Sequence, residues 1–311
     1  MVGRPPLTAS EQRLLPSDED IAFYREHGWY LSKPLFSQAE LDEVLAASER
    51  FYAGHRDRRL PVKPEASAYW EPSHGDVQRH NDYICYESGT IGRILCKPLI
   101  GAVAARLIGA PVVRLWSSTL IYKPACPAEP TNIVPWHTDR HHWPTCTSDE
   151  LLTAFVPLHD CDEESGTLTV ADGSHRWEEL PPAAGDDPTL HFAERPRDAL
   201  QAMLEAAARH NGAEVSSIPL VIERGRVSFH HCRTYHASGP NLKDHPRRVV
   251  TVRFQEGINR WRPHLRPNGE PTLYSHDALV RRTAEGHPDY ADPEFCPVVW
   301  NEGTEDALAS R

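Results

Sequence analysis

Residues 225–254 read GRVSFHHCRTYHASGPNLKDHPRRVVTVRF, and this stretch decides the fold class. Two runs in it, 226–229 and 249–254, are rich in β-branched and aromatic residues, which favour β-strands. Gly239, Pro240 and Asn241 lie between them and are typical of turns. The stretch therefore predicts two short strands separated by a turn.

The same pattern extends back to residue 111. Four further runs predict strands over 112–122, 153–158, 167–170 and 218–222. One helix is expected over 197–210, with Gly212 after its end. Several short strands with turn signals between them are typical of an antiparallel sandwich or jelly roll. We therefore expect a mainly β fold.

Helices and loops are expected around this core. Residues 1–16 are polar and Pro-rich, which predicts a flexible N-terminal arm. Helices are predicted from Ser17 to Gly28, after the capping box that begins at Ser37, and over 91–107, with a long loop over 54–82. The domain prediction is an arm (1–16) and a single domain (17–311) made of a helical part (17–110), a jelly-roll core (111–256) and a C-terminal wrap of loops (257–311).

Composition excludes several classes of partner. The 311 residues carry a formal charge of −11, which argues against binding of a phosphate backbone. No apolar run is long enough to span a membrane, and the N-terminus has no secretory signal core. The seven cysteines are scattered and never in C-x-x-C spacing, which indicates reduced thiols and no zinc site. We expect a cytoplasmic monomer or homodimer that acts on a small-molecule substrate, without nucleic-acid or membrane partners.

A metal-binding pattern occurs in the segment Trp136-His137-Thr138-Asp139. Residues i and i+2 of an extended strand point to the same face, so His137 and Asp139 can bind one ion. One carboxylate and two imidazoles on one face of an octahedral ion form the facial triad of non-haem Fe(II) oxygenases. In a chain with 18 histidines, however, His-x-Asp alone is more typical of a charged surface loop than of a metal site.

A third ligand is suggested by His236, which ends a strand pattern and precedes the small residues 237–239. Small residues beside an imidazole leave room for a ligand. Eleven positions later Arg247 is placed to grip a carboxylate through two parallel hydrogen bonds. His230 and His231 are alternative ligands, although their mid-strand positions favour a core role for one of them.

Three segments in this order, 136–139, 158–175 and 225–254, together resemble the phytanoyl-CoA dioxygenase family. The early FYREHGW at 23–29 and the helix that begins with the Ser37 capping box are also similar to the N-terminus of that family. The resemblance covers roughly residues 15–256, and the motifs are specific jointly rather than singly. It implies a double-stranded β-helix (jelly roll, cupin-like) with N-terminal and flanking helices.

The resemblance also implies an Fe(II)- and 2-oxoglutarate-dependent dioxygenase that consumes O2. The implied iron ligands are His137, Asp139 and His236. The implied cosubstrate-binding residues are Arg247 and Ser238, which would hold the far carboxylate of 2-oxoglutarate, with Lys123 and Phe155 lining its pocket. Halogenating relatives replace the acidic ligand with a small residue, so the carboxylate at position 139 favours oxygenation.

Polar and aromatic residues near these motifs are candidates for substrate binding. They are Tyr122, Arg140, His141, His142, Trp143, His80, Asn81 and Arg253. Tyr122 and Trp143 are equally typical of core aromatics, and His141 and His142 of a solvated loop. Arg253 alternates in phase with Arg247, so both should face the barrel interior, and an arginine there needs a polar or anionic partner.

The predicted reaction is therefore oxidation of a C–H bond in a polar small molecule. Hydroxylation is the expected outcome, with oxidative cyclisation or desaturation as variants, in secondary-metabolite pathways such as antibiotic biosynthesis. Two alternatives stay open: a metal-dependent isomerase or hydrolase on a cupin-like barrel, and a non-catalytic binding barrel. Binding of 2-oxoglutarate separates the first alternative from the oxygenase, and iron affinity separates the second.

Overall fold

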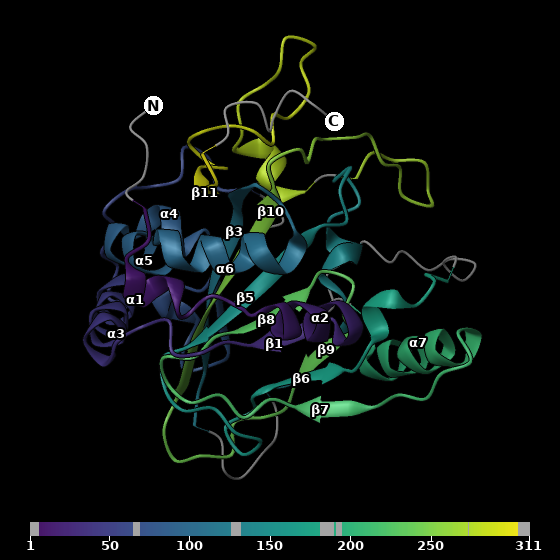
Figure 1. Cartoon of the computed structure of the whole chain (residues 1–311), viewed down its shortest axis with the longest axis horizontal. Helices are drawn as coiled ribbons and strands as arrows, with labels where there is room; N and C mark the ends of the chain where they lie inside the picture. Colours follow the sequence, from purple (N-terminus) through teal and green to yellow (C-terminus); the bar gives the residue numbers. More distant parts are fainter. Residues whose placement is uncertain are drawn as a thin grey trace.

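Two antiparallel sheets form the centre of the molecule (Figure 1). The computed structural model describes residues 6–64, 69–125, 132–180, 190, 195–272 and 274–303. In the seven-stranded sheet the order is β1 (Trp29–Leu31), β8 (Ser228–His231), β5 (Leu151–Pro157), β10 (Arg247–Glu256), β3 (Val112–Lys123) and β11 (Val298–Asn301), and β2 (Arg79–Asp82) also pairs with β3. In the four-stranded sheet the order is β4 (Val134–His137), β9 (His236–Ser238), β6 (Leu168–Ala171) and β7 (Ser217–Pro219). The mainly β, jelly-roll prediction is confirmed.

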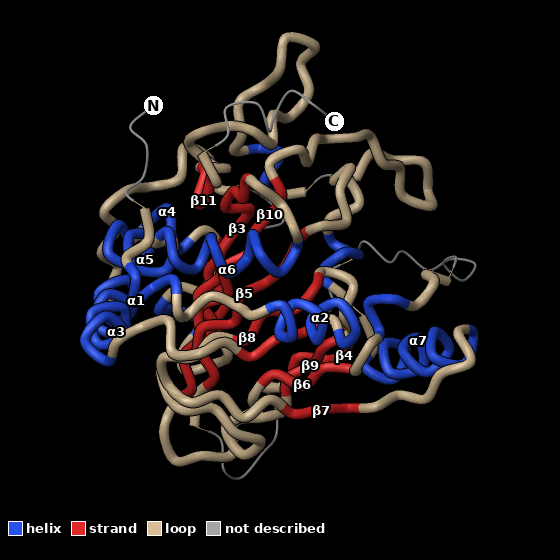
Figure 2. The backbone as a smooth tube through the Cα atoms, viewed as in Figure 1, coloured by secondary structure: helices blue, strands red, loops and turns tan. Residues whose placement is uncertain are grey.

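Helices cover the outside of this core, as Figure 2 shows. The α-helices are α1 (Ala9–Gln12), α2 (Asp18–His27), α3 (Gln38–Tyr52), α4 (Ile84–Glu87), α5 (Gly89–Leu95), α6 (Pro98–Ile108) and α7 (Arg197–His210). The 3-10 helices are η1 (Pro72–His74), η2 (Asp139–His142), η3 (Ser174–Arg176) and η5 (Ser275–Ala278). α6 packs on β3, β5, β10 and β11, whereas α7 packs beside β4 of the smaller sheet.

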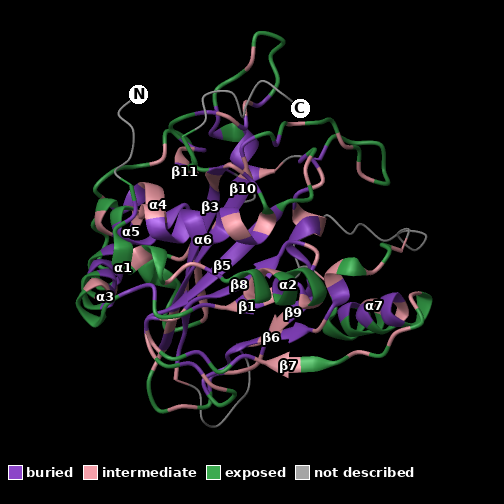
Figure 3. Cartoon of the chain, viewed as in Figure 1, coloured by how far each residue is buried: buried purple, intermediate pink, exposed green. Residues whose placement is uncertain are grey.

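Strand β10 separates two cores by the alternation of its side chains. Val250 and Val252 pack into the core between the large sheet and the helices. Val249, on the other face, packs with Phe155 and with residues of the smaller sheet. Most strand residues are buried, and exposure gathers on the helix surfaces and outer loops (Figure 3). The odd-numbered side chains of β10 therefore face the barrel interior.

Four expectations for the outer segments are corrected. Residues 6–16 are not a loose arm, because Thr8 and Glu11 form a capping box that begins α1 and Leu7 is buried; residues 1–5 lie outside the described part. The helix expected over 91–107 is broken before Pro98, whose ring cannot continue a preceding helix but suits the first turn of α6.

The expected loop 54–82 also contains the strand β2, which pairs with β3. The C-terminal wrap is not made of loops alone, because it supplies β11 to the large sheet. Residues 273 and 304–311 of that wrap lie outside the described part. Within the described residues, no helix combines the length and apolar character that crossing a membrane requires.

Candidate metal centre and cosubstrate pocket

His137, Asp139 and His236 come together inside the barrel. Their ligand atoms all lie within 4.8 Å of one another, and all three residues are buried. His137 ends β4, Thr138 is extended, and Asp139 begins η2, so the i and i+2 side chains share a face as expected. His236 begins β9 and is the register partner of His137. Together the three side chains could hold one metal ion.

Hydrogen bonds orient the three side chains toward a common point. Nδ1 of His137 lies 2.8 Å from the Pro135 carbonyl, and Nδ1 of His236 lies 3.0 Å from the Thr234 carbonyl. A carbonyl only accepts, so each Nδ1 carries the proton and each Nε2 keeps a lone pair for a metal. Thr153 Oγ1 donates to Oδ2 of Asp139 (2.5 Å), which fixes the carboxylate.

A fourth buried imidazole, His230, lies beside this group. Its Nε2 is 3.5 Å from Oδ2 of Asp139, and its ring centroid is 4.3 Å from that of His236. Neither ring nitrogen has a hydrogen-bond partner among the described residues. The ligand-atom cluster itself comprises residues 137, 139 and 236 and does not include His230. His230 therefore borders the site rather than completing it.

Electrostatics keep the cluster in the protonation states that metal binding requires. Burial alone would raise the pKa of Asp139, but His230, His236 and Arg253 together hold it well below its usual value. Burial first, and then His230, lowers the pKa of His236 to about 4. At neutral pH the carboxylate is ionised and this imidazole is neutral.

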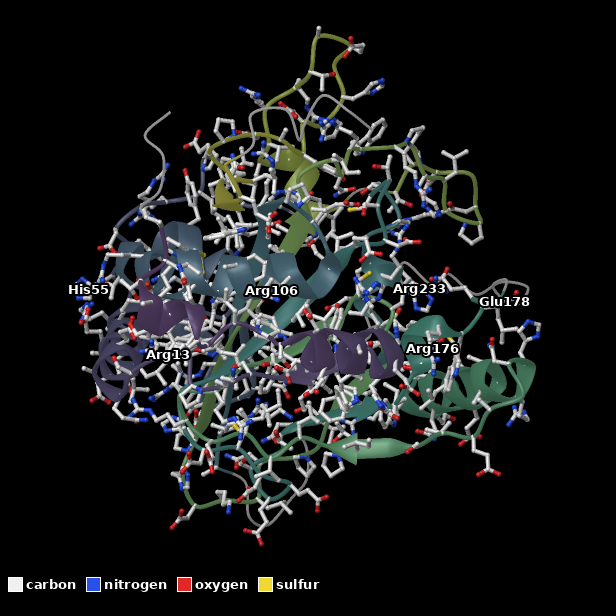
Figure 4. The ribbon with its side chains drawn as sticks, in the orientation of Figure 1. Arg13, His55, Arg106, Arg176, Glu178 and Arg233 are labelled. Carbon is white, nitrogen blue, oxygen red and sulfur yellow. The ribbon has the colours of Figure 1, made fainter. Side chains whose placement is uncertain are left out.

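His231, the last residue of β8, and Arg233, just after it, lie away from the site. The main-chain N–H of Arg233 donates to Nδ1 of His231 (3.1 Å), and burial lowers the pKa of His231 to about 3. Arg233 lies on the α7 side of the molecule (Figure 4), where Nη2 donates to the Trp177 carbonyl (2.6 Å). Of the two alternative histidine ligands, only His230 is near the metal cluster.

A second buried cluster lies at the start of β10. Arg247 is 3% exposed, and its Nε and Nη1 have no hydrogen-bond partner among the described residues. Its Nη2 donates to Ser238 Oγ (3.4 Å), and its guanidinium lies 5.6 Å from the centroid of the Phe155 ring. Lys123 Nζ donates to the same Ser238 Oγ (2.6 Å) and to the Gly239 carbonyl (2.5 Å). All four predicted cosubstrate residues therefore meet in one place.

This second cluster has an unbalanced charge. Burial lowers the pKa of Arg247, and burial together with the charge of Arg247 lowers the pKa of Lys123 well below its usual value. A buried cation without an anion is costly. The unpaired donors of Arg247 thus fit the carboxylate of a bound organic acid.

Gly166 allows a close approach beside this cluster. Its φ is +66°, and a Cβ there would lie 2.3 Å from the Gly239 carbonyl oxygen. Ser238 Oγ donates to the Gly166 carbonyl (2.8 Å), which orients the hydroxyl that Lys123 and Arg247 contact. A side chain at position 166 would therefore disturb the pocket.

Two of the candidate substrate residues lie on the wrong face. Tyr122 packs in the helix-side core, 5.9 Å from the Tyr52 ring, with the Arg79 guanidinium 4.0 Å from its own centroid. Asn81 is fully buried and donates to the Trp70 carbonyl (3.2 Å). Strand alternation turns both side chains away from the metal cluster, so their assignment to substrate binding is corrected.

Arg140 and Trp143 serve the structure of the segment after β4. Arg140 Nε pairs with Asp149 (2.6 Å), and its Nη1 donates to the Trp143 carbonyl. Trp143 is 2% exposed and donates from Nε1 to the hydroxyl of Tyr274 (3.1 Å). These bonds occupy the guanidinium of Arg140, so its assignment to substrate binding is also corrected.

The remaining candidates lie nearer the interior. The His142 ring is 6.0 Å from the His137 ring, and the His141 ring is 6.4 Å from that of Tyr235; both histidines are half-buried. His80 is the register partner of Ile121 on β3 and contacts Gln78 through Nε2 (2.7 Å). Arg253 donates from Nη1 to Thr119 Oγ1 (2.8 Å).

Sequence reasoning missed Thr153, His230 as a neighbour of Asp139, and the pair Thr119 and Asp82. Thr119 Oγ1 donates to Asp82 Oδ1 (2.6 Å). Each of these contacts joins two different elements that are 14 or more residues apart in the chain. No local pattern marks them, because they depend on the register between strands.

Comparisons with known proteins agree with this geometry. The model of the phytanoyl-CoA dioxygenase family matches residues 24–249. An ectoine dioxygenase of Bordetella parapertussis is 26% identical over 251 residues, covering 79% of this chain and 78% of that protein. The 1-deoxypentalenic acid 11-beta-hydroxylase of Streptomyces exfoliatus is 26% identical and covers 72% of this chain and 75% of that protein.

A solved structure extends the likeness over almost the whole chain. The epimerase SnoN, in complex with Fe3+, α-ketoglutarate and nogalamycin RO, superposes with a TM-score of 0.64 and 25% identity. The match covers 94% of this chain and 99% of that one. It therefore includes the C-terminal segment that the resemblance in sequence motifs did not reach.

Proposed function

Because the chain belongs to the phytanoyl-CoA dioxygenase family, we propose that it is an Fe(II)- and 2-oxoglutarate-dependent oxygenase with His137, Asp139 and His236 as its iron ligands. One observation supports this most strongly: the buried triad lies in the same barrel as the buried guanidinium of Arg247, whose Nε and Nη1 have no hydrogen-bond partner among the described residues. A metal-dependent isomerase or hydrolase would have no use for that arginine. An oxygenase needs it for the far carboxylate of 2-oxoglutarate.

The donor set fits iron. Two neutral imidazoles and one carboxylate on one side of an ion leave the other side open for cosubstrate and dioxygen. Bound Fe(II) and 2-oxoglutarate supply the oxidising chemistry that attacks a C–H bond. The Pro135 and Thr234 carbonyls orient the imidazoles, and Thr153 holds Oδ2 of the carboxylate.

The protein's own groups also hold the cosubstrate. Arg247 and Ser238 would bind its far carboxylate, and Lys123 would add a second positive charge. Phe155 and Val249 pack beside Arg247 and keep water from the pocket. This arrangement pre-organises positive charge where the anion binds.

For the reaction outcome we propose hydroxylation of a polar small molecule in secondary metabolism. A hydroxylase and an ectoine dioxygenase among the relatives support this, while the solved epimerase shows that the fold also serves another outcome. Product mass separates the cases: hydroxylation adds one oxygen atom, cyclisation or desaturation removes two hydrogen atoms, and epimerisation changes nothing. A monomer or homodimer stays a prediction.

The test is succinate formation that requires Fe(II), 2-oxoglutarate and O2 together. Asp139→Ala and His236→Ala should each abolish turnover and reduce the iron bound per chain. Asp244→Ala and His245→Ala, which change an exposed acid–histidine pair, are the matched controls and should change neither. Full turnover in either triad variant would refute the assignment.

A further inference from the structure

The barrel interior contains a second arginine, Arg253, on the same strand face as Arg247. Six residues separate them, and a strand rises about 3.4 Å per residue, so their Cα atoms lie roughly 20 Å apart. The two guanidinium groups therefore serve different ends of the interior. A cosubstrate held by Arg247 does not account for Arg253.

Arg253 lies at the metal end of the barrel. It is the register partner of Thr153, whose hydroxyl donates to Asp139. Its charge, after the larger effects of His230 and His236, helps to lower the pKa of Asp139 against the effect of burial, and it adds to the lowering of the pKa of His236 by burial and His230. Trp143 lies close by, with its ring centroid 6.0 Å from the guanidinium carbon.

A hydrogen-bonded chain orients this guanidinium. Arg253 Nη1 donates to Thr119 Oγ1 (2.8 Å), and Thr119 Oγ1 donates to Asp82 Oδ1 (2.6 Å). Within the described part of the chain this is the one hydrogen bond that Arg253 donates. The side chain is half-buried, so its other N–H groups stay available to a ligand in the interior.

Two other arginines of the chain, which have structural roles, serve as a comparison for Arg253. Arg140 pairs directly with Asp149 (2.6 Å), and Arg248 pairs directly with Glu49 (2.7 Å). Among the described residues Arg253 instead makes no direct ion pair, and it reaches the Asp82 carboxylate only through a neutral hydroxyl. A half-buried guanidinium left without a direct anion is poised to receive one.

We propose that Arg253 binds an anionic oxygen of the substrate, most simply a carboxylate, and thereby determines which C–H bond faces the metal. Thr119 and Asp82 are positioning residues that aim the guanidinium. The inference rests on the proposed function, since it names the class of substrate for that same site. It assigns Arg247 to the cosubstrate and Arg253 to a small organic acid.

The test uses protein loaded with Ni(II) and 2-oxoglutarate, so that no turnover occurs. A panel of small organic carboxylates, each paired with its uncharged amide, is titrated by calorimetry. We expect at least one carboxylate to bind with a Kd below about 1 mM and its amide to bind about tenfold more weakly or worse. Arg253→Gln should weaken the carboxylate about 10–100-fold and leave the amide unchanged.

Matched variants separate binding from folding. Arg248→Gln changes an arginine on the opposite, helix-side face of the same strand and should leave carboxylate affinity unchanged. Arg253→Lys should restore part of the affinity. Thr119→Val should weaken carboxylate binding and Thr119→Ser should restore it, a rescue that a purely structural role of the threonine methyl group would not give.

The outcomes distinguish this inference from the proposed function. Equal binding of carboxylates and amides, no binding by any carboxylate, or unchanged affinity in Arg253→Gln would overturn the inference alone. Loss of 2-oxoglutarate affinity in Arg253→Gln would also overturn it, because Arg253 would then serve the cosubstrate. If the wild-type protein bound no 2-oxoglutarate, the proposed function would fail and this inference with it.

Discussion

Arg247→Met is expected to act in opposite directions on the empty and the loaded protein. In the empty protein the guanidinium is buried beside Lys123 with Nε and Nη1 unpaired. Replacing buried charged groups with apolar side chains of similar volume is often neutral or stabilising by about 1–4 kcal/mol. The free energy of unfolding without ligand should therefore stay unchanged or rise, although a buried side chain has been changed.

The loaded protein should lose most of its affinity for 2-oxoglutarate. Two donor nitrogens of Arg247, Nε and Nη1, are buried without a partner among the described residues, and a hydrogen bond to a charged group contributes about 1.5–3 kcal/mol. Together they would contribute about 3–6 kcal/mol, which corresponds to a dissociation constant higher by about 10²–10⁴-fold. At 100 times the wild-type Kd, 2-oxoglutarate should stabilise the wild type by about 2.7 kcal/mol and the variant hardly at all.

Urea denaturation with and without 2-oxoglutarate measures both effects in one experiment. Arg248→Met is the matched control, because that arginine lies on the opposite face of the strand and pairs directly with Glu49. The Arg248 side chain is largely buried and Glu49 is exposed, so this control should lose some stability but keep its ligand response. If Arg247→Met were strongly destabilised when empty, or kept the full response to 2-oxoglutarate, the reasoning about unpaired donors would be refuted.

Three further outcomes are expected. Thr153→Val removes the hydrogen bond to Asp139 and should weaken metal binding about 10–100-fold in a metal titration, whereas unchanged affinity would show that the bond does not matter. Gly166→Ala should lower the free energy of unfolding by more than about 1–2 kcal/mol, because φ is +66° and its Cβ would collide with the Gly239 carbonyl; a stable variant would contradict this. Burial lowers the pKa of His276 from 6.5 to about 3, so the unfolded chain binds its proton first as the pH falls. The free energy of unfolding should therefore drop by about 1.4 kcal/mol per pH unit below 6.5 because of His276 alone. Urea titrations between about pH 4 and 7 should show a smaller dependence of this free energy on pH in His276→Phe.

The strands that sequence alone predicted are those whose own residues favour strands. β3 and β10 are long runs of β-branched residues, and both lie within a residue or two of their expected bounds. β2 was missed because its sequence, Arg79-His-Asn-Asp82, has no strand preference of its own. Pairing with β3 imposes the extended conformation there, and such tertiary effects are invisible to local propensity.

The residues of the candidate site also divide into those that the local sequence could place and those that it could not. His137 and Asp139 are two residues apart, so local geometry was enough to place both on one face. Tyr122 and Lys123 are adjacent, yet one packs against helices and the other against Ser238. A shift of one residue along the strand exchanges the faces on which the two side chains lie. The sequence does not show which of two neighbouring residues faces the interior when both residue types would suit a binding site.

β10 carries three arginines, and the strand alternation alone decides which face of the sheet each side chain occupies. Arg248 faces the helices, where Glu49 gives it a direct carboxylate partner. Arg247 and Arg253 face inward, where the described residues offer each of them hydroxyl groups rather than a carboxylate. Burying charge in this way destabilises the empty barrel, so the apolar packing of Val250 and Val252 against the helices must offset it. Binding of an anion restores the free energy of folding that the buried charge costs the ligand-free barrel. Because the two arginines are far apart along the strand, two anions are required rather than one.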